Sequence, residues 1–248
     1  MKLDSQAQIL DFSPYDTRTE AEATHNLGEK VVSSDRVFRF ARAGEAITGG
    51  YLAVQEDTIA TEITMAVLAG VIGSREITFT NAANTTVAGE YSEGYAIISY
   101  GTGIGQTYKI SDLYITATGV RALASGSAST VVVDGPIAVG LDTTSKLDLV
   151  KNLWADVTMT ATATLHPAGV PLVAIGSGDF GWLQTRGVCG VFADGTIAAG
   201  TGAIVDASSA GAVDVSTEAS YIVDPLVGRA FWHAGAASYA HPVFLLID

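Results

Sequence analysis

The sequence of this chain of 248 residues predicts an all-β fold, built as a barrel or a sandwich. Three observations support this prediction. Short segments rich in Val, Ile, Thr and aromatic residues recur along most of the chain, and many alternate apolar with polar side chains. Turn residues interrupt these segments at regular short spacing, and 27 glycines supply the positive φ angles that tight turns need. No long amphipathic run of helical period accompanies them, as an α/β enzyme would require.

The first thirty residues differ from the rest of the chain. Residues 19–26 are polar and rich in Ala and Glu, and Pro14 biases the residue before it away from helix. We expect an extended N-terminal arm, residues 1–30, with Phe12 and Tyr15 as its anchors. The arm either orders on contact with a partner, packs back on its own β body, or is a disordered tail, and the sequence leaves these alternatives open.

From residue 31 onward the sequence predicts strand after strand. Residues 36–43 intersperse arginines with apolar side chains, and we expect a half-buried strand there. Any helix is expected only as a turn or two at residues 63–71, where the neighbouring threonines still favour a strand. The other strands are expected at residues 46–54, 76–80, 94–100, 106–110, 112–118, 130–133, 146–150, 157–162, 170–175, 179–185, 188–193, 202–205, 211–215, 227–234 and 241–247.

Three connections carry more specific expectations. Pro171 lacks the amide hydrogen that a central strand needs, so residues 170–175 are expected at a sheet edge. The run Ala-Asp-Gly-Thr at residues 193–196 predicts a hairpin. The break in the pattern at residues 151–156 divides the body into a first β lobe, 31–150, and a second, 151–248, with a single domain as the alternative.

Charge and hydropathy exclude several kinds of partner. The chain has 26 acidic and 13 basic residues, a formal net charge of -13, which is the wrong sign for neutralising phosphates. No nucleic-acid partner is therefore expected. The longest apolar stretch, residues 65–72, is too short to span a bilayer, and the N-terminus lacks the features of a signal peptide. We therefore expect no membrane partner and a cytosol-like compartment.

No motif predicts catalysis or a cofactor. The run 101–105, Gly-Thr-Gly-Ile-Gly, follows a strand as a phosphate loop would, but a strand follows it instead of the helix that would bind the anion. A glycine hairpin is expected there. Four dispersed histidines and the single Cys189 are too few for a metal site, and no serine occupies a nucleophile elbow. A pair of glycosidase carboxylates far apart in sequence stays open.

Several stretches of the chain are distinctive as a set. They are residues 35–44, Asp-Arg-Val-Phe-Arg-Phe-Ala-Arg-Ala-Gly, residues 94–98 and 101–110 around the glycine run, residues 181–187, Gly-Trp-Leu-Gln-Thr-Arg-Gly, and residues 242–248, Pro-Val-Phe-Leu-Leu-Ile-Asp. Together they resemble the capsid decoration, or cement, proteins of tailed bacteriophages, over most of the chain from residue 31. The N-terminal arm has no counterpart in that resemblance.

The resemblance implies a structural virion protein, not an enzyme, that needs no cofactor. Such a protein is made in the host cytoplasm and binds the outside of the capsid, where it bridges neighbouring subunits of the major capsid protein, often as a homotrimer. Two other functions stay open. One is a capsid-shell or tail-tube subunit, although the long spine helix of the usual shell fold is missing; the other is a carbohydrate-binding or hydrolytic β-module on the phage surface.

Aromatic residues and arginines are the candidate partner contacts, because both are enriched at protein interfaces. The residues expected to make such contacts are Phe12, Tyr15, Arg36, Arg39, Trp182 and Arg186. Trp154 and Trp232 are further candidate anchors, with core packing expected for at least two of the three tryptophans.

Overall fold

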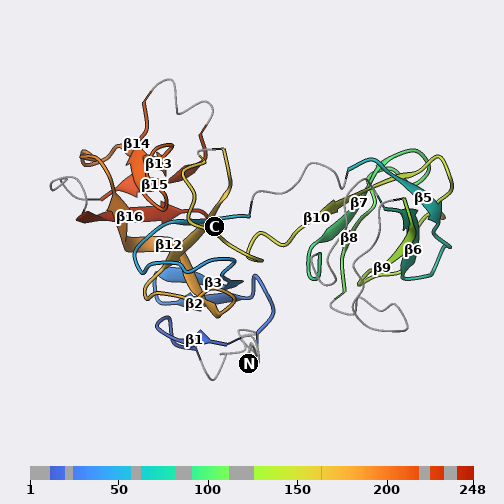
Figure 1. Ribbon diagram of the computed structural model, residues 1–248, viewed down its shortest axis with the longest axis horizontal. Helices are drawn as coiled ribbons and strands as arrows, with labels where there is room; N and C mark the ends of the chain where they lie inside the picture. Colours follow the sequence, from blue (N-terminus) through green and yellow to red (C-terminus); the bar gives the residue numbers. More distant parts are fainter. Residues whose placement is uncertain are drawn as a thin grey trace, which may run out of the picture. The chain divides into compact units, whose positions relative to one another are not determined.

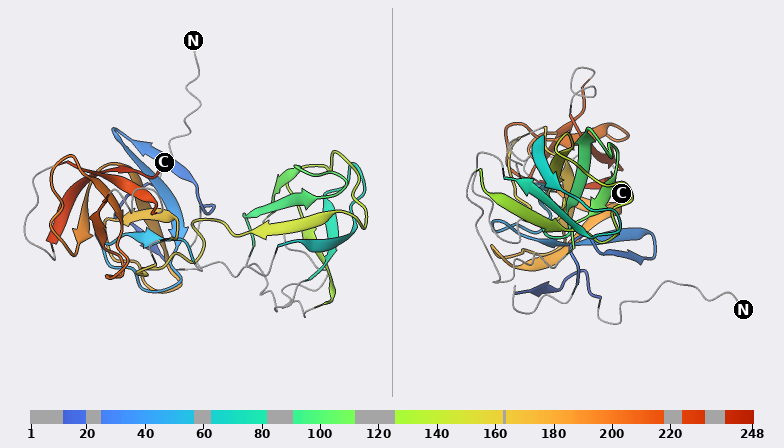
Figure 2. Two further views of the ribbon diagram at one scale, coloured as in Figure 1. Left: turned by 90° about the horizontal axis from the view of Figure 1, so that it is seen from above. Right: turned by 90° about the vertical axis from the view of Figure 1, so that its right-hand side faces the viewer.

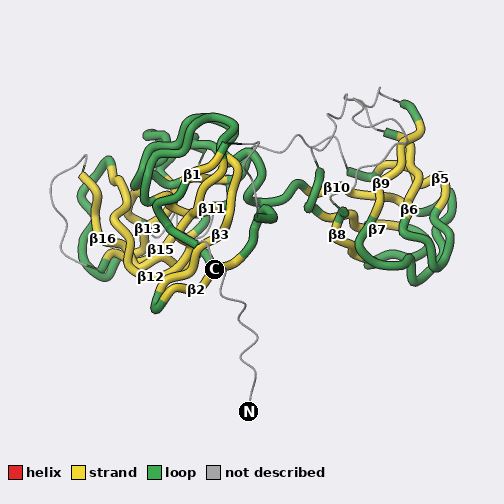
Figure 3. Tube along the Cα trace, turned by 90° about the horizontal axis from the view of Figure 1, so that it is seen from below, coloured by secondary structure: helices red, strands yellow, loops and turns green. Residues whose placement is uncertain are grey.

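The computed structural model describes residues 12–19, 25–56, 63–81, 91–111, 126–162, 164–217, 224–231 and 239–248. In this part of the chain every regular element is a strand, as Figure 3 shows, and no helix that could cross a membrane occurs there. The all-β prediction is confirmed. The helical alternative at residues 63–71 is wrong, because Met65–Ala69 forms a strand, β5, with Met65 and Val67 buried on one face.

The chain divides into two compact units, one of which is made of two separate stretches of the sequence. Unit 1 contains Met1–Asp57 and Leu153–Asp248, and unit 2 contains Thr58–Asn152. The expected first lobe, residues 31–150, is therefore wrong at its start, because strands formed by residues 36–54 pair with strands that begin after residue 166. The expected boundary after residue 150 lies close to the observed junction at Asn152.

Unit 1 is organised around one long strand, β12 (Phe180–Ala193), which covers both strands expected in this region. The first half of β12 pairs with β3 (Arg36–Arg42), and the second half pairs with β16 (Tyr239–Leu246). The other strands of unit 1 are β1 (Thr17–Arg18), β2 (Lys30–Ser33), β4 (Ala53–Val54), β11 (Pro167–Pro171), β13 (Gly202–Val205), β14 (Val213–Val215) and β15 (Leu226–Ala230).

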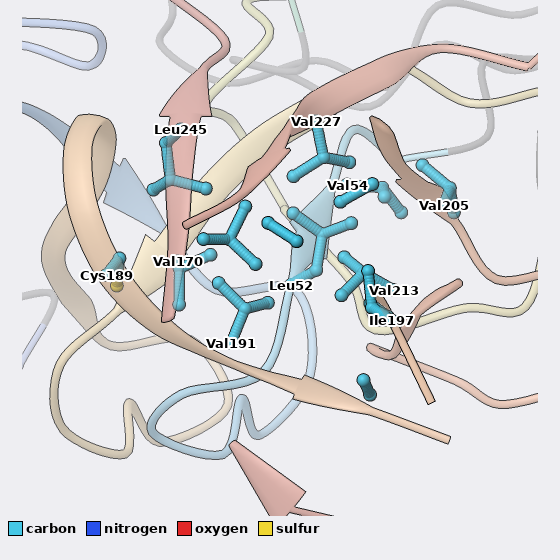
Figure 4. Packing of buried hydrophobic residues seen from close by; sticks show 14 of the residues in the cluster. Leu52, Val54, Val170, Cys189, Val191, Ile197, Val205, Val213, Val227 and Leu245 are labelled. Carbon is cyan, nitrogen blue, oxygen red and sulfur yellow. The ribbon is translucent and has the colours of Figure 1, made fainter. Parts of the chain in front are cut away.

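Five of these strands close into a barrel. The sheet runs in the order β14, β13, β15, β16 and β12, and Ala193 of β12 pairs in parallel with Val213 of β14 (Figure 1). The interior is filled by aliphatic side chains, among them Val191, Val227 and Leu245 (Figure 4). Burial of such side chains is the main free-energy gain of a β-barrel core. Cys189 packs among them as a small apolar residue.

Two expected connections in unit 1 are corrected. Strands β12 and β13 are consecutive but not paired, so residues 193–196 form no hairpin; β13 pairs with β14 and β15 instead. Strand β11 is not an edge strand either, because it lies between β12 and β4. Pro171 is compatible with this position because it is the last residue of β11.

Unit 2 is a separate curled sheet with its own core. Its strands are β5, β6 (Glu76–Thr80), β7 (Tyr95–Tyr100), β8 (Thr107–Lys109), β9 (Ala128–Val132) and β10 (Lys146–Val150), in the spatial order β8, β7, β10, β5, β6, β9. The two ends of this order approach at a bridge between Ile110 and Val133, so the sheet is curled (Figure 2). Its core contains Phe79, Ile98 and Leu147. The strand expected at residues 112–118 lies outside the described residues.

Candidate interaction surfaces

An aromatic cluster holds the N-terminal arm on the β body of unit 1. Trp182 on β12 is only 2% exposed, and its ring centroid lies 5.1 Å from that of Phe40 on β3. The Phe12 ring meets Trp182 edge-on at 5.0 Å and Phe38 at 5.3 Å. Trp182 is therefore a core residue, which corrects the expectation of a partner contact, and the half-buried Phe12 anchors the arm to its own chain.

Further contacts tie the arm to the same place. Strand β1 pairs with the start of β12, and Phe40 donates its amide hydrogen to the carbonyl of Glu29 at 3.0 Å. His25 packs between Phe40 and Trp182, at 5.1 and 5.2 Å, and its Nδ1 lies 3.1 Å from Oε2 of Glu29. In its described residues the arm thus packs back on its own body, one of the alternatives that the sequence left open.

Two of the expected arginines converge on Asp248, next to β16. Arg39 donates from Nε to Oδ2 at 2.8 Å and from Nη2 to Oδ1 at 2.9 Å, which is a bidentate pair. These hydrogen bonds hold the pKa of Asp248 below its ordinary value, against the opposing effect of partial burial. Lys30 adds its Nζ at 3.6 Å from Oδ2, and Arg186 donates from Nη1 to the main-chain oxygen at 3.3 Å. Arg39 therefore stabilises the unit itself.

Three of the expected contact residues are accessible on the surface. Tyr15 is 62% exposed, and the side chain of Arg186 is exposed on β12. Arg36 is half-buried, with its guanidinium 5.3 Å from the ring centroid of Phe38, and it forms no ion pair with a described residue. Trp154 is half-buried against the core of unit 1, and Trp232 lies outside the described residues.

The outer surface of the ladder between β12 and β16 is apolar, and the sequence analysis did not find it. We call this surface the β12–β16 face; it consists of Val188, Gly190, Phe192, Ala240, Pro242, Phe244 and Leu246. Val188 and Leu246 are 39% and 41% exposed. A signal was present, because both strands carry small or apolar residues at the alternate positions where a solvated antiparallel face would carry polar ones.

Unit 2 presents a second apolar surface, where three of its loops meet. We call it the apolar tip; it consists of Val71, Ile72, Ile104 and Val139, whose exposed fractions range from 48% to 68%. Gln106 ties two of the loops together by donating from Nε2 to the carbonyls of Gly103 at 3.1 Å and Val139 at 3.2 Å. Gly73 joins the third loop through its amide, 2.8 Å from the carbonyl of Ile137.

The loop at residues 101–105 is one of these three. Strands β7 and β8 on either side of it pair as antiparallel neighbours, so the expected glycine hairpin is confirmed. Gly101, Gly103 and Gly105 have φ angles of 78°, 82° and 89°, a region that side chains with a Cβ rarely adopt. The glycines are thus explained by the turn, which presents Ile104 to solvent.

Reactive groups are sparse in the part of the chain that the structure describes. It contains no group of three or more His, Cys, Asp or Glu side chains that could hold a metal ion. Burial raises the pKa of the Cys189 thiol to about 11, so the thiol is protonated at neutral pH and is a poor nucleophile.

No protein-family model, curated protein or solved structure matches this chain.

Proposed function

We propose that this chain is a structural binding protein, without enzymatic activity, that attaches to the outer surface of a phage capsid. The observation that supports the proposal is that two separately cored units each expose an apolar surface, the β12–β16 face and the apolar tip. A protein that bridges neighbouring subunits needs two attachment surfaces. Exposed apolar patches on soluble proteins commonly mark sites of protein–protein interaction.

The charge of the chain fits the same location. A net charge of -13 disfavours contact with a packaged genome and favours an outward position on the particle. The sequence resemblance supplies the identity of the lattice: the proposed partners are the major capsid protein and further copies of this chain, as a homotrimer. The proposed place of synthesis is the host cytoplasm.

The test uses capsids assembled without this chain, to which the purified protein is added. We expect the protein to sediment with the capsids and to raise their melting temperature, because binding to the assembled state stabilises it. Ile72→Asp in the apolar tip should weaken binding, because it places a charge in an apolar contact. The matched control is Ile63→Asp, a similarly exposed isoleucine of unit 2 outside the tip. A protein that neither sediments with capsids nor changes their melting contradicts the proposal.

A further inference from the structure

The β12–β16 face is a continuous surface across the neighbouring strands of unit 1. In the antiparallel register Val188 lies opposite Phe244, and Gly190 lies opposite Pro242. Residues that are directly opposite share a face of the sheet, so these side chains form rows across the ladder. Tyr51 extends the surface, because its ring stacks on Phe192 with centroids 4.4 Å apart and planes 8° apart.

The middle of this face is open. A Cβ built on Gly190 would meet only the Cβ of Ala240, at 3.7 Å, so the glycine leaves a shallow site without a side chain. Strand β16 is hydrogen-bonded on both sides, by β12 and β15. On the other edge of this half of β12, the Phe192 amide donates to the carbonyl of Gly50 at 2.8 Å, and Ala193 pairs with Val213. A partner therefore contacts this face through side chains and does not add a strand to it.

Arginines stand at the rim of the face. Arg229 on β15 lies opposite Phe244, and Arg186 lies opposite Leu246, so both border the face on the same side of the sheet. Arg36 lies beside Gly187, since a Cβ built on that glycine would be 3.1 Å from the Arg36 Cγ. Arg229 is exposed and, like Arg36, has no ion pair with a described residue.

The local charge is opposite to that of the whole chain. Lys30 and Arg39 lie next to this rim, and both contact the carboxylate of Asp248. Because the whole chain has a net charge of -13, the positive rim is a local property of the β12–β16 face and does not follow from the overall composition. The apolar centre is unsuited to a phosphate backbone, which binds to clustered cations without an apolar patch.

From this arrangement we infer that the β12–β16 face binds a protein segment whose apolar side chains are flanked by carboxylates. The inference rests on the proposed function and specifies the chemistry of the partner at one of its two surfaces. Apolar side chains of the partner cover Val188, Gly190 and Phe244, and its carboxylates pair with Arg186 and Arg229 at the rim. Charges at an interface rim mainly set the association rate and its dependence on salt.

The experiment measures binding of the full chain to capsids that lack it, at low and high salt. Arg229→Glu should weaken binding by about tenfold at low salt and reduce the salt dependence, because it replaces an attractive rim charge by a repulsive one. Val188→Asp should weaken binding by about tenfold at both salt concentrations. The controls are Lys109→Glu on β8 and Val150→Asp on β10, which make the same changes of charge in unit 2 and should stay within about twofold of the unchanged protein.

A second experiment needs no capsid. Its probe is a synthetic peptide in which valine alternates with aspartate, and its control is the same peptide with lysine in place of aspartate. Nuclear magnetic resonance spectra of the full chain should show shifts at Val188 and Arg229 with the aspartate peptide and none with the lysine peptide.

The capsid and peptide experiments distinguish a failure of the inference from a failure of the proposed function. If capsids bind and Arg229→Glu and Val188→Asp behave like their controls, the inference is overturned and the proposed function stands. If capsids do not bind but the aspartate peptide selectively shifts the face, the proposed function fails and the inference stands. Absence of both effects overturns both.

Discussion

The two units are built in different ways from the same kind of strand. Unit 2 is a continuous stretch, Thr58–Asn152, and pairs β5 with β6 and β7 with β8, which are neighbours in sequence. Unit 1 pairs β3 with β12 across the whole length of unit 2. Local pairing is visible in a sequence pattern and closes small loops, whereas pairing across a long stretch has a larger loop-closure cost.

The entry and exit of unit 2 show how unit 1 tolerates the interruption. Val54 at the end of β4 pairs with Pro167 of β11, and its amide hydrogen is donated to the carbonyl of Thr158 at 2.9 Å. Chain segments on either side of unit 2 are thus hydrogen-bonded to each other within unit 1. We expect the two units to unfold as separate cooperative transitions, and the following predictions test this difference between them.

The largest effect is expected from the aromatic cluster of unit 1. Trp182→Ala removes a buried side chain in contact with Phe12 and Phe40, and should lower the free energy of unfolding of unit 1 by about 3–5 kcal/mol. Phe79→Ala should produce a loss of similar size in unit 2 alone. All three tryptophans of the sequence lie in unit 1, so tryptophan fluorescence during denaturant unfolding follows that unit, and circular dichroism follows both. One common transition, shifted by either variant, would show that the units unfold together.

A smaller effect is expected in the glycine loop of unit 2. Gly105→Ala should cost about 1 kcal/mol, because its positive φ disfavours alanine but no atom lies within 4 Å of the new Cβ. Gly101→Ala should cost about 2–3 kcal/mol, because its Cβ would also overlap the carbonyl oxygen of Thr144. Denaturant unfolding of both variants gives this difference. Equal losses would contradict the close packing of the loop, and a change in the fluorescence transition would contradict the independence of unit 1.

The carboxylate of Asp248 should make unit 1 sensitive to acid. Its pKa is lowered in the folded state, chiefly by the hydrogen bonds from Arg39, so its contribution to stability is present above the ordinary value of 3.8 and is lost as the pH falls through the folded pKa. Because the side chain is partly exposed, we expect Asp248→Asn to cost about 1 kcal/mol at pH 7 and less at pH 3. Asp35→Asn makes the same change of charge at an exposed turn. Equal pH profiles for the two variants would refute the role of the pair.

The smallest effect concerns the reactivity of the Cys189 thiol and involves no change in stability. A thiol pKa raised from 9.0 to about 11 lowers the thiolate fraction of Cys189 by roughly 100-fold at pH 8. Alkylation by iodoacetamide should therefore proceed through unfolding of unit 1 and accelerate at the denaturant concentration where that unit unfolds. The unfolded chain serves as the control for intrinsic reactivity. Rapid labelling of the native protein would contradict the burial of this side chain.

For the candidate contacts, the sequence indicated which types of residue make contacts but not which part of the protein they contact. The sequence predicts Trp182 and Phe12 as contacts with a partner protein, but both rings pack against aromatic residues of β3 in the same chain. The strand expected at residues 36–43 exists, but it is not half-buried: Val37 and Ala41 are buried on one face, and Phe38 and Phe40 on the other. The β12–β16 face was missed because its two strands are distant in sequence, and its rows exist only in their register.

The sequence by itself determined those features that depend on residues close together in the chain. The β fold, the turn at residues 101–105, and the strands at β6, β7 and β10 follow from side-chain alternation and from glycines, which act within a few residues of the chain. Only the tertiary structure decided that β12 is one strand, that unit 2 interrupts unit 1, and that Arg186 and Arg229 share one apolar face. These facts depend on hydrogen-bonded register between segments far apart in the chain, and register is set by the mutual burial of both partners, which neither segment specifies alone.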